Sequence, residues 1–399
     1  MSGYVDATSG ATEHCEAMAL LHADLAEDYK EISSLVTSKL WHQLTLKILA
    51  FLEEPKNYRT TAEGTSSFLA LYDKVVQSVD KKLNPLSLAR IASDVASSLL
   101  FQDSTAATAV LENLQNLPTA ATLYVEYKLA LIKLKLLEAK GQPVDMNELQ
   151  EQLKRNALLL QELNFSQDSA IVHSAHFQCS MTYRKAVGPP ETFYKEAISY
   201  LNYTAMQDIE DPYQLAIDLS LAALTGERVF NFGQVVTTPI LSVLQNTPHA
   251  WLVDLMHASA QGDVVQFQTL LQQHAAAIQK EPALVNRAQA LQEKITLLAL
   301  VHMVFERPSS ERTLDFREIS DRVHFPVDQV ELVVMRALSL GLIEGSMDQV
   351  DQTLEVTWVL PRVLDKAQLK ELSVRFGEWA DKVSKTRDYM AEQTPTLLA

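Results

Sequence analysis

The chain has 399 residues, enough for two or more packed domains, and 47 % of them are apolar, which is ample material for a hydrophobic core. Only 11 residues are glycine, well below the usual share of about 7 %, and this scarcity favours helices over a turn-rich β protein. The formal charge of −16 disfavours non-specific binding to nucleic acid or anionic lipid, because an acidic surface repels phosphate groups.

Cysteine content and apolar segments indicate the compartment. Cys15 and Cys179 are the only cysteines, too few for a disulfide framework, which fits a reducing compartment. The first residues lack the basic and then apolar pattern of a signal peptide. The longest apolar run, Ile295 to Phe305, is far shorter than the roughly 20 residues that cross a bilayer. We therefore expect a protein of the cytoplasm and nucleus without membrane contact.

The first two segments of the chain differ in pattern. Residues 1–25 are mostly small and polar, which predicts a disordered tail. From residue 26 to 305, apolar residues recur at helical spacing in blocks of 12 to 20 residues. In one block, one face is formed by Leu123, Tyr127, Ala130, Leu134 and Leu137, and Gly141 is placed to end the helix in a left-handed conformation.

A repeated unit extends over residues 26–305. Helix, glycine, a few residues and helix recur around Gly141, Gly188, Gly226 and Gly262, which are 47, 38 and 36 residues apart. Each helix pair has a buried face that needs a neighbour, so the units should stack. The fold class expected is mainly α, with a right-handed solenoid that is similar to tetratricopeptide-type repeats.

The pattern changes over residues 306–362. Phe316, Ile319 and Val323 predict a short helix, Pro326 suits the start of a second helix, and Gly341 ends it. Residues 342–346 and 353–359 predict two strands joined by a polar turn. Helix, turn, helix and hairpin together indicate a winged helix. Residues 363–399 predict a C-terminal amphipathic helix and tail.

A winged helix often binds DNA, but the charge of this one argues against that function. Between Thr313 and Pro361 there are nine acidic residues and three arginines, a formal charge of −6. Asp328 and Glu331 lie near the end of the helix that would enter the groove. Because phosphate contacts supply most of the affinity for DNA, we expect no nucleic-acid partner.

The predicted hairpin suggests a different use. Leu354, Val356 and Trp358 alternate with Thr353, Glu355 and Thr357, so the two sets lie on opposite faces of the strand. The unpaired edge of a two-stranded wing can accept a strand from a neighbouring chain. Alternatively the apolar face only covers the core of its own domain. Both interpretations are compatible, because one face can pack inward while the edge pairs outward.

No motif in the sequence assembles a reaction centre. His173, His176 and Cys179 are three residues apart in turn, and side chains so spaced diverge around a helix and cannot converge on one metal ion. Phe230 and Phe232 are interpreted as an aromatic staple between two repeats. Motifs for phosphate, dinucleotide, serine-hydrolase or zinc-protease sites are absent from the sequence. We expect neither an enzyme nor a cofactor.

The combination of helical solenoid, acidic winged helix and C-terminal helix resembles PCI-domain proteins. These are scaffold modules of the proteasome lid, the COP9 signalosome and the eukaryotic translation initiation factor three complex. Stretches such as "GERVFNFGQVVTTPIL", "VELVVMRALSLGLIEGSMDQVD" and "VTWVLPRVLD" are most similar to a subunit of the 26S proteasome lid. The resemblance covers roughly residue 34 to the end and is most specific in the last third.

The resemblance implies a function and partners. It implies a non-catalytic scaffold subunit that supports lid assembly and the degradation of ubiquitinated proteins. Such a subunit would belong to a hetero-oligomer with other lid subunits, and it would lie near the ubiquitin-receptor subunit. The other two PCI complexes remain alternatives. Neighbouring winged helices would meet at the edge formed by Leu342, Ile343, Glu344, Thr353, Leu354, Glu355, Val356, Thr357 and Trp358. A bundle of C-terminal helices would use Leu372, Phe376, Trp379 and Val383.

Overall fold

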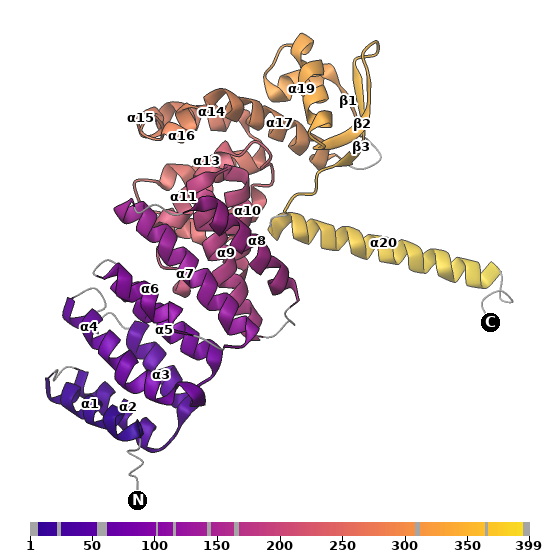
Figure 1. Cartoon of the computed structure of the whole chain (residues 1–399). Coiled ribbons are helices and arrows are strands. Elements are labelled where there is room, and N and C mark those ends of the chain that lie inside the picture. Colours follow the sequence, from indigo (N-terminus) through magenta and orange to yellow (C-terminus); the bar gives the residue numbers. More distant parts are fainter. Residues whose placement is uncertain are drawn as a thin grey trace, which may run out of the picture. The chain divides into compact units, whose positions relative to one another are not determined.

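The computed structural model describes residues 7–21, 25–53, 62–100, 103–114, 117–141, 145–162, 167–307, 312–363 and 366–393. The chain divides into two compact units, Met1–Ile209 and Glu210–Ala399. Helices make up most of both units, and the described strands all lie in the second (Figure 1). The predicted fold class, helical repeats followed by a small winged-helix domain, is confirmed.

The first unit is a series of helices in which neighbours in sequence pack against each other. One continuous apolar core runs through it from Ala11 to Tyr183. Its elements are α1 (Ala7–Leu21), α2 (Ala26–Thr37), α3 (Trp41–Glu53), α4 (Ala62–Leu71), η3 (Tyr72–Val76), η4 (Gln77–Lys82), α5 (Pro85–Leu99), α6 (Ser104–Glu112), α7 (Thr119–Lys140), α8 (Met146–Gln161), α9 (Gln167–Val187), α10 (Pro190–Tyr203) and η5 (Met206–Asp208).

The segment expected to be a disordered tail contains the first helix. Residues 1–25 include α1, whose Ala11 and Cys15 are fully buried and whose Met18 is almost so. These three side chains are four and three residues apart, so they share the buried face of α1, a helix that contacts α2, η3 and η4. Because the surrounding residues are small and polar, the apolar periodicity of this helix is not evident in the sequence. Residues 1–6 and 22–24 lie outside the described part.

The helix around Tyr127 forms as predicted. Leu123, Tyr127, Ala130 and Leu134 of α7 are buried, and Leu137, the last residue of the predicted face, is half-buried. Gly141 follows the helix with φ +64°, and its N–H donates to the Leu137 carbonyl oxygen at 3.0 Å. A left-handed residue at this position turns the chain out of the helix and satisfies a terminal carbonyl, and glycine adopts that conformation without strain.

The second unit combines further repeats with the winged helix. Its elements are α11 (Pro212–Thr225), α12 (Gly233–Thr237), η6 (Pro239–Leu244), α13 (Ala250–Gln261), α14 (Val264–Gln273), α15 (Ala275–Ile278), α16 (Pro282–Val285), α17 (Ala288–Glu306), β1 (Thr313–Asp315), α18 (Phe316–Val323), α19 (Val327–Ser339), β2 (Ile343–Asp348), β3 (Thr353–Val359) and α20 (Lys366–Gln393).

Helix α17 joins the repeats to the winged helix. It packs against α11, α13, α14 and α16, and also against α18, α19 and β3. Ten of its residues, from Leu291 to Val304, are buried, because a helix covered on several sides is apolar around most of its circumference. We expected a domain boundary between residues 305 and 306. That position lies at the end of α17, and both the repeats and the winged helix that this helix contacts belong to the unit Glu210–Ala399.

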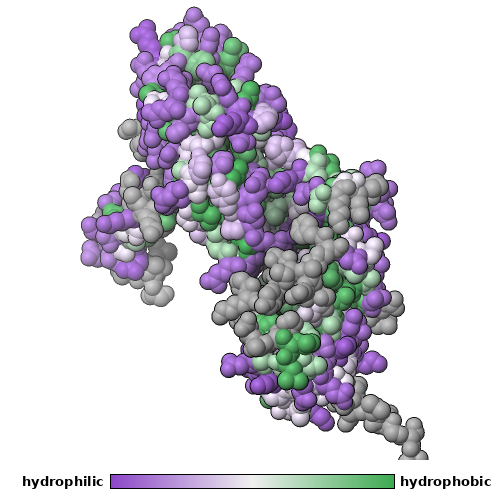
Figure 2. Space-filling model, turned by 90° about the vertical axis from the view of Figure 1, so that its left-hand side faces the viewer, coloured by the Kyte–Doolittle hydropathy of each residue, from purple (hydrophilic) through white to green (hydrophobic). Residues whose placement is uncertain are grey.

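The surface is mainly polar. Hydrophilic residues cover much of the face in Figure 2, with smaller hydrophobic patches between them, in keeping with the charge of −16. Among the described helices, none has both the length and the hydropathy needed to cross a bilayer.

Candidate partner-binding surfaces

The wing is a three-stranded antiparallel sheet in the order β1-β3-β2. Strand β1 pairs with the start of β3, from Thr313 opposite Glu355 to Asp315 opposite Thr353. Strand β1 is not apparent from the sequence, and its presence makes β3 the central strand, with the edge of β3 covered over these residues. In the described part of the chain, the longest edge left unpaired is therefore that of β2, Ile343–Asp348.

A β-bulge divides the pairing of β2 with β3. Glu344 lies opposite Trp358, whereas the next residue, Gly345, lies opposite Val356. Thr357 is thus an extra residue in β3, and the alternation of faces inverts beyond it. As a result Leu354 and Val356 are buried, while Trp358 is 38 % exposed. The expectation that Trp358 shares the inner face therefore does not hold.

The predicted wing residues fall into two groups. The side chains in the domain's own core are Leu342, Ile343, Leu354 and Val356. Those exposed on the outer face are Glu344, Glu355, Thr357 and Trp358, and Thr353 is half-buried. The exposed group is available to a partner through its side chains, whereas Ile343 can contribute only edge backbone groups.

Gly345 permits the close approach of the strands at the bulge. A Cβ atom at this position would overlap the carbonyl oxygen of Glu355 in β3. Since that oxygen belongs to the backbone of the central strand, it cannot move aside as a flexible side chain could. A residue without a side chain is therefore required for this register.

Substitution Gly345→Ala is expected to destabilise the wing by about 2 kcal/mol, because relief of the overlap requires a shift of the strand backbone. Hydrogen exchange of the β2 and β3 amides measures this directly. Ser346→Ala is the matched control, since Ser346 is an exposed neighbour on the same strand. Equal protection of the two variants would contradict the assignment of Gly345 to the bulge.

Helix α20 carries an exposed apolar stripe. All of its side chains that the structure describes are exposed, including Phe376 at 60 % and Trp379 at 65 %. The stripe consists of Leu369, Leu372, Phe376, Trp379, Val383 and Met390, separated by three, four, three, four and seven residues. This is the a/d spacing of a helix that packs lengthwise against other helices. Residues 394–399 of the predicted C-terminal segment lie outside the described part.

Most of the positive charge of the winged helix is neutralised by carboxylates of α17. Arg336 of α19 donates to Glu293 of α17 at 3.0 Å, and Arg322 of α18 lies 3.6 Å from Glu306. Two of the three arginines counted in the sequence are thus paired with carboxylates. Asp328 remains exposed in the first turn of α19. The helix that would enter a DNA groove therefore presents negative charge to solvent.

The histidines and cysteine of α9 make packing contacts. His173 stacks on Tyr203 with ring centroids 5.1 Å apart, and His176 lies edge-on to Tyr127 at 5.0 Å. Cys179 is fully buried, and burial raises the pKa of its thiol to about 12, which keeps it protonated. Across the described residues, no three His, Cys, Asp or Glu side chains are grouped to hold a metal ion.

The segment around Phe230 contains a polar contact that the sequence analysis missed. The Lys294 ammonium lies 4.9 Å from the ring centroid of Phe232 and donates to the carbonyl oxygens of Ala223 at 2.6 Å and Gly226 at 2.7 Å. Lys294 is 5 % exposed. It caps the end of α11, where Gly226 has φ −67° rather than a left-handed conformation. The signal in the sequence that could have indicated this contact is the single lysine, Lys294, at the start of an apolar segment.

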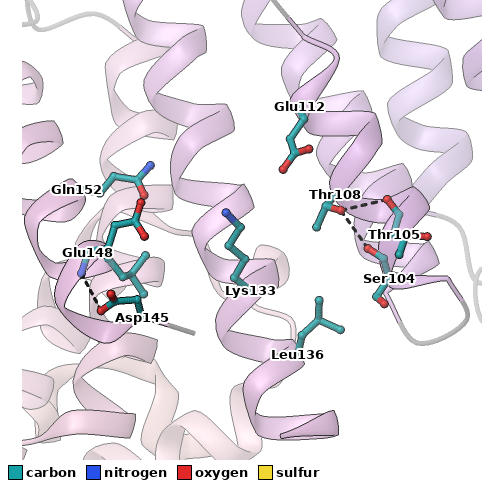
Figure 3. Close-up of a pocket in the computed structure, with 10 residues that line it drawn as sticks. Ser104, Thr105, Thr108, Glu112, Lys133, Leu136, Asp145, Glu148 and Gln152 are labelled. Atoms are coloured by element: carbon teal, nitrogen blue, oxygen red, sulfur yellow. Dashed lines mark hydrogen bonds between the residues drawn. The ribbon is translucent and has the colours of Figure 1, made fainter. Parts of the chain in front are cut away.

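A polar groove of about 410 Å³ lies across α6, α7 and α8 (Figure 3). Lys133 of α7 stands between hydroxyl groups of α6 and carboxylates of α8. Thr108 donates to the Ser104 and Thr105 carbonyls, and Asp145 accepts from the N–H groups of Asn147 and Glu148. These hydrogen bonds are made with the local helix backbone, and none of them pairs a nucleophile with a general base. The arrangement therefore gives no sign of a catalytic site in the groove.

Helical repeats followed by a winged helix whose exposed surfaces suit protein partners define a PCI-domain protein. The sequence matches the family model described as PSD13 N-terminal repeats over residues 28–256 and the PCI domain over residues 271–358. The chain belongs to the family of 26S proteasome non-ATPase regulatory subunit 13.

Relatives align over nearly the whole chain. The proteins named 26S proteasome non-ATPase regulatory subunit 13 homolog B and homolog A of Arabidopsis thaliana are each 33 % identical, with 98 % of this chain and 99 % of theirs covered. The subunit 13 of Dictyostelium discoideum is 30 % identical, with 98 % of this chain and 100 % of its own covered.

Proposed function

We propose that this chain is a non-catalytic scaffold subunit of the proteasome lid. In this role it supports lid assembly and ATP-dependent degradation of ubiquitinated proteins by holding neighbouring subunits. The exposed stripe of α20 is the observation that carries the proposal. The chain acts in a hetero-oligomer in the cytoplasm and nucleus, without nucleic acid or membrane, and its repeats lie near the ubiquitin-receptor subunit.

The stripe supports a helix bundle with other subunits. Burial of each large apolar side chain contributes about 1.5–3 kcal/mol, so Leu372, Phe376, Trp379 and Val383 together form a strong association surface. A stripe of large apolar side chains exposed along a whole helix is uncommon on a monomer and marks an interaction surface. The a/d spacing selects a helical partner, because it forms a narrow seam along the helix axis.

The wing supports a second contact. The unpaired edge of β2 offers backbone N–H and carbonyl groups to a strand of a neighbouring winged helix. Glu344 of β2 and Trp358 of β3 lie opposite each other and are both exposed. They add a carboxylate and an aromatic side chain to that contact. Aromatic side chains at the centre of an interface contribute a large share of its affinity.

Removal of residues 366–399 tests the proposal. The truncated chain retains Arg362 and Val363 in their contacts with the second unit and should remain folded by circular dichroism. We expect it to lose co-purification with the lid subunits, as measured by affinity capture and mass spectrometry. Incorporation equal to that of the full chain would contradict the proposal. Capture of COP9 signalosome or initiation factor three subunits by the full chain would favour those alternatives.

Nucleic-acid binding is tested separately. A mobility-shift titration of the full chain with duplex DNA at low salt is expected to give no complex, because the winged helix carries a charge of −6 and two of its arginines are paired. A salt-sensitive shift would argue for the nucleic-acid alternative.

A further inference from the structure

The chain between β3 and α20 is fixed to the body of the second unit. The Leu360 N–H donates to the Leu342 carbonyl oxygen at 2.8 Å. Beyond it, Arg362 and Val363 line a pocket of about 320 Å³ together with residues of α12, α13 and α17. After an interval of two residues, 364 and 365, the described chain resumes as α20. The pocket therefore holds the point from which the partner-binding helix departs.

Arg362 makes two hydrogen bonds in this pocket. Its Nη2 donates to the Ala260 carbonyl oxygen at the end of α13, and its Nη1 lies 2.7 Å from His302 Nδ1 on α17. A guanidinium has donors only, so Nδ1 must carry a lone pair and His302 must be neutral. The other ring nitrogen, Nε2, then carries the proton and donates to Glu306 at 3.1 Å.

The charged and polar side chains around His302 come from four elements. Arg362 belongs to the segment before α20, Glu306 to α17, and Arg322 of α18 lies 3.6 Å from Glu306. His257 of α13 lines the same pocket. Burial lowers the pKa of His302 below its usual 6.5, and the Arg362 and Arg322 charges lower the pKa further, while Glu306 opposes them. Protonation of Nδ1 would remove the acceptor of Arg362 and place two cations in contact.

A second contact holds the same segment without charge. A Cβ atom at Gly233, the first residue of α12, would lie 2.7 Å from the Cβ of Val363. Val363 thus packs on a surface that is open only because residue 233 is glycine. Any side chain at this position displaces Val363 or its backbone.

We propose that Arg362, His302 and Glu306 form an acid-sensitive clasp that fixes the attachment point of α20 and opens when His302 is protonated. The clasp is closed at neutral pH. Since the closed form disfavours the proton, its stability is full above pH 6.5 and declines as the pH falls below that value. Opening frees residues 360–363 from the pocket and widens the range of positions that α20 can take.

Hydrogen exchange of the full chain, with the amides of Leu360, Arg362 and Val363 followed at pH 7.5 and 5.5, tests the clasp. After correction for the intrinsic pH dependence, we expect exchange of these amides to rise at pH 5.5 by a factor of up to roughly ten, the limit that applies one pH unit below the ordinary histidine pKa. Amides of α7, in the first unit, are the internal control and should not change.

Variants separate the clasp from general acid sensitivity. His302→Gln keeps an acceptor for Arg362 but does not titrate, so its exchange should be low at both pH values. His302→Arg should show fast exchange already at pH 7.5. If His302→Gln shows the same acid-dependent rise as the unmodified chain, or the unmodified chain shows no rise, the proposal is overturned. The glutamine comparison decides the matter even where the arginine variant does not fold.

Gly233→Ala tests the apolar contact. It should raise exchange at Val363 at pH 7.5, whereas Gly377→Ala, with no atom within 4 Å of its added Cβ, should leave that exchange unchanged. Equal exchange in these two variants would show that the contact between Gly233 and Val363 does not hold the segment. These measurements use the isolated chain, so their failure would leave the proposed lid function untouched, and failure of lid incorporation would leave the clasp untouched.

Discussion

Replacement of both Phe376 and Trp379 by aspartate should abolish incorporation of the chain into its multi-subunit particle. The two side chains are 60 % and 65 % exposed and lie at the centre of the α20 stripe. In a helix bundle they would be buried, and aromatic anchors of this kind contribute about 2 kcal/mol or more each. A loss of about 4 kcal/mol corresponds to roughly a thousand-fold weaker affinity.

Affinity capture of the tagged variant followed by quantitative mass spectrometry measures this loss. Val374→Asp is the matched control. Val374 is 55 % exposed on the same helix, but it lies on the opposite side from the stripe, so the same charge there should leave incorporation intact. Circular dichroism should show equal helix content in both variants. Full incorporation of the double variant would mean that α20 does not join a bundle.

Lys294→Met is expected to destabilise the second unit by about 3 kcal/mol. The ammonium donates two short hydrogen bonds to the end of α11 and lies against Phe230 and Phe232. Methionine fills a similar volume but leaves the buried carbonyls of Ala223 and Gly226 without a donor. Unsatisfied buried groups cost about 1–3 kcal/mol each, and this cost outweighs the gain from removing a buried charge.

Arg287 provides the comparison for Lys294. It donates to the Thr225 carbonyl oxygen at 2.8 Å, so it caps the same helix, but its side chain is 40 % exposed. Water can replace it, and Arg287→Met should cost about 1 kcal/mol or less. Thermal unfolding and hydrogen exchange of α11 measure both variants. Equal effects of the two substitutions would show that burial does not set the contribution of Lys294.

Short-range patterns were readable from the sequence. The periodicity and end of α7, the inward face of α18 and the bounds of β3 agree with the structure. Each depends on residues within a few positions of one another: apolar spacing, a terminal glycine, or alternation along a strand. The resemblance to PCI-domain proteins rested on the same local stretches and agrees with the family found for the chain.

Features that join distant segments were not readable. Strand β1 has three residues, too few for a pattern, and exists because it pairs with β3 forty residues later. The bulge that exposes Trp358 depends on the register between two strands, which alternation along one strand does not reveal. Helix α1 was not predicted because most of the side chains on its buried face are small. That face is recognised only from its burial when α1 packs against its neighbours, α2 among them.

The sequence alone determined the helical class, the acidic winged helix and the apolar stripe of α20, because composition, charge and spacing are properties of the chain itself. Tertiary structure alone decided which strand edge is free, why α17 unites the repeats with the winged helix, and how Lys294 and Arg362 find their carbonyl partners. Those contacts join residues 68 to 102 positions apart. Their geometry follows from packing, which local sequence does not specify.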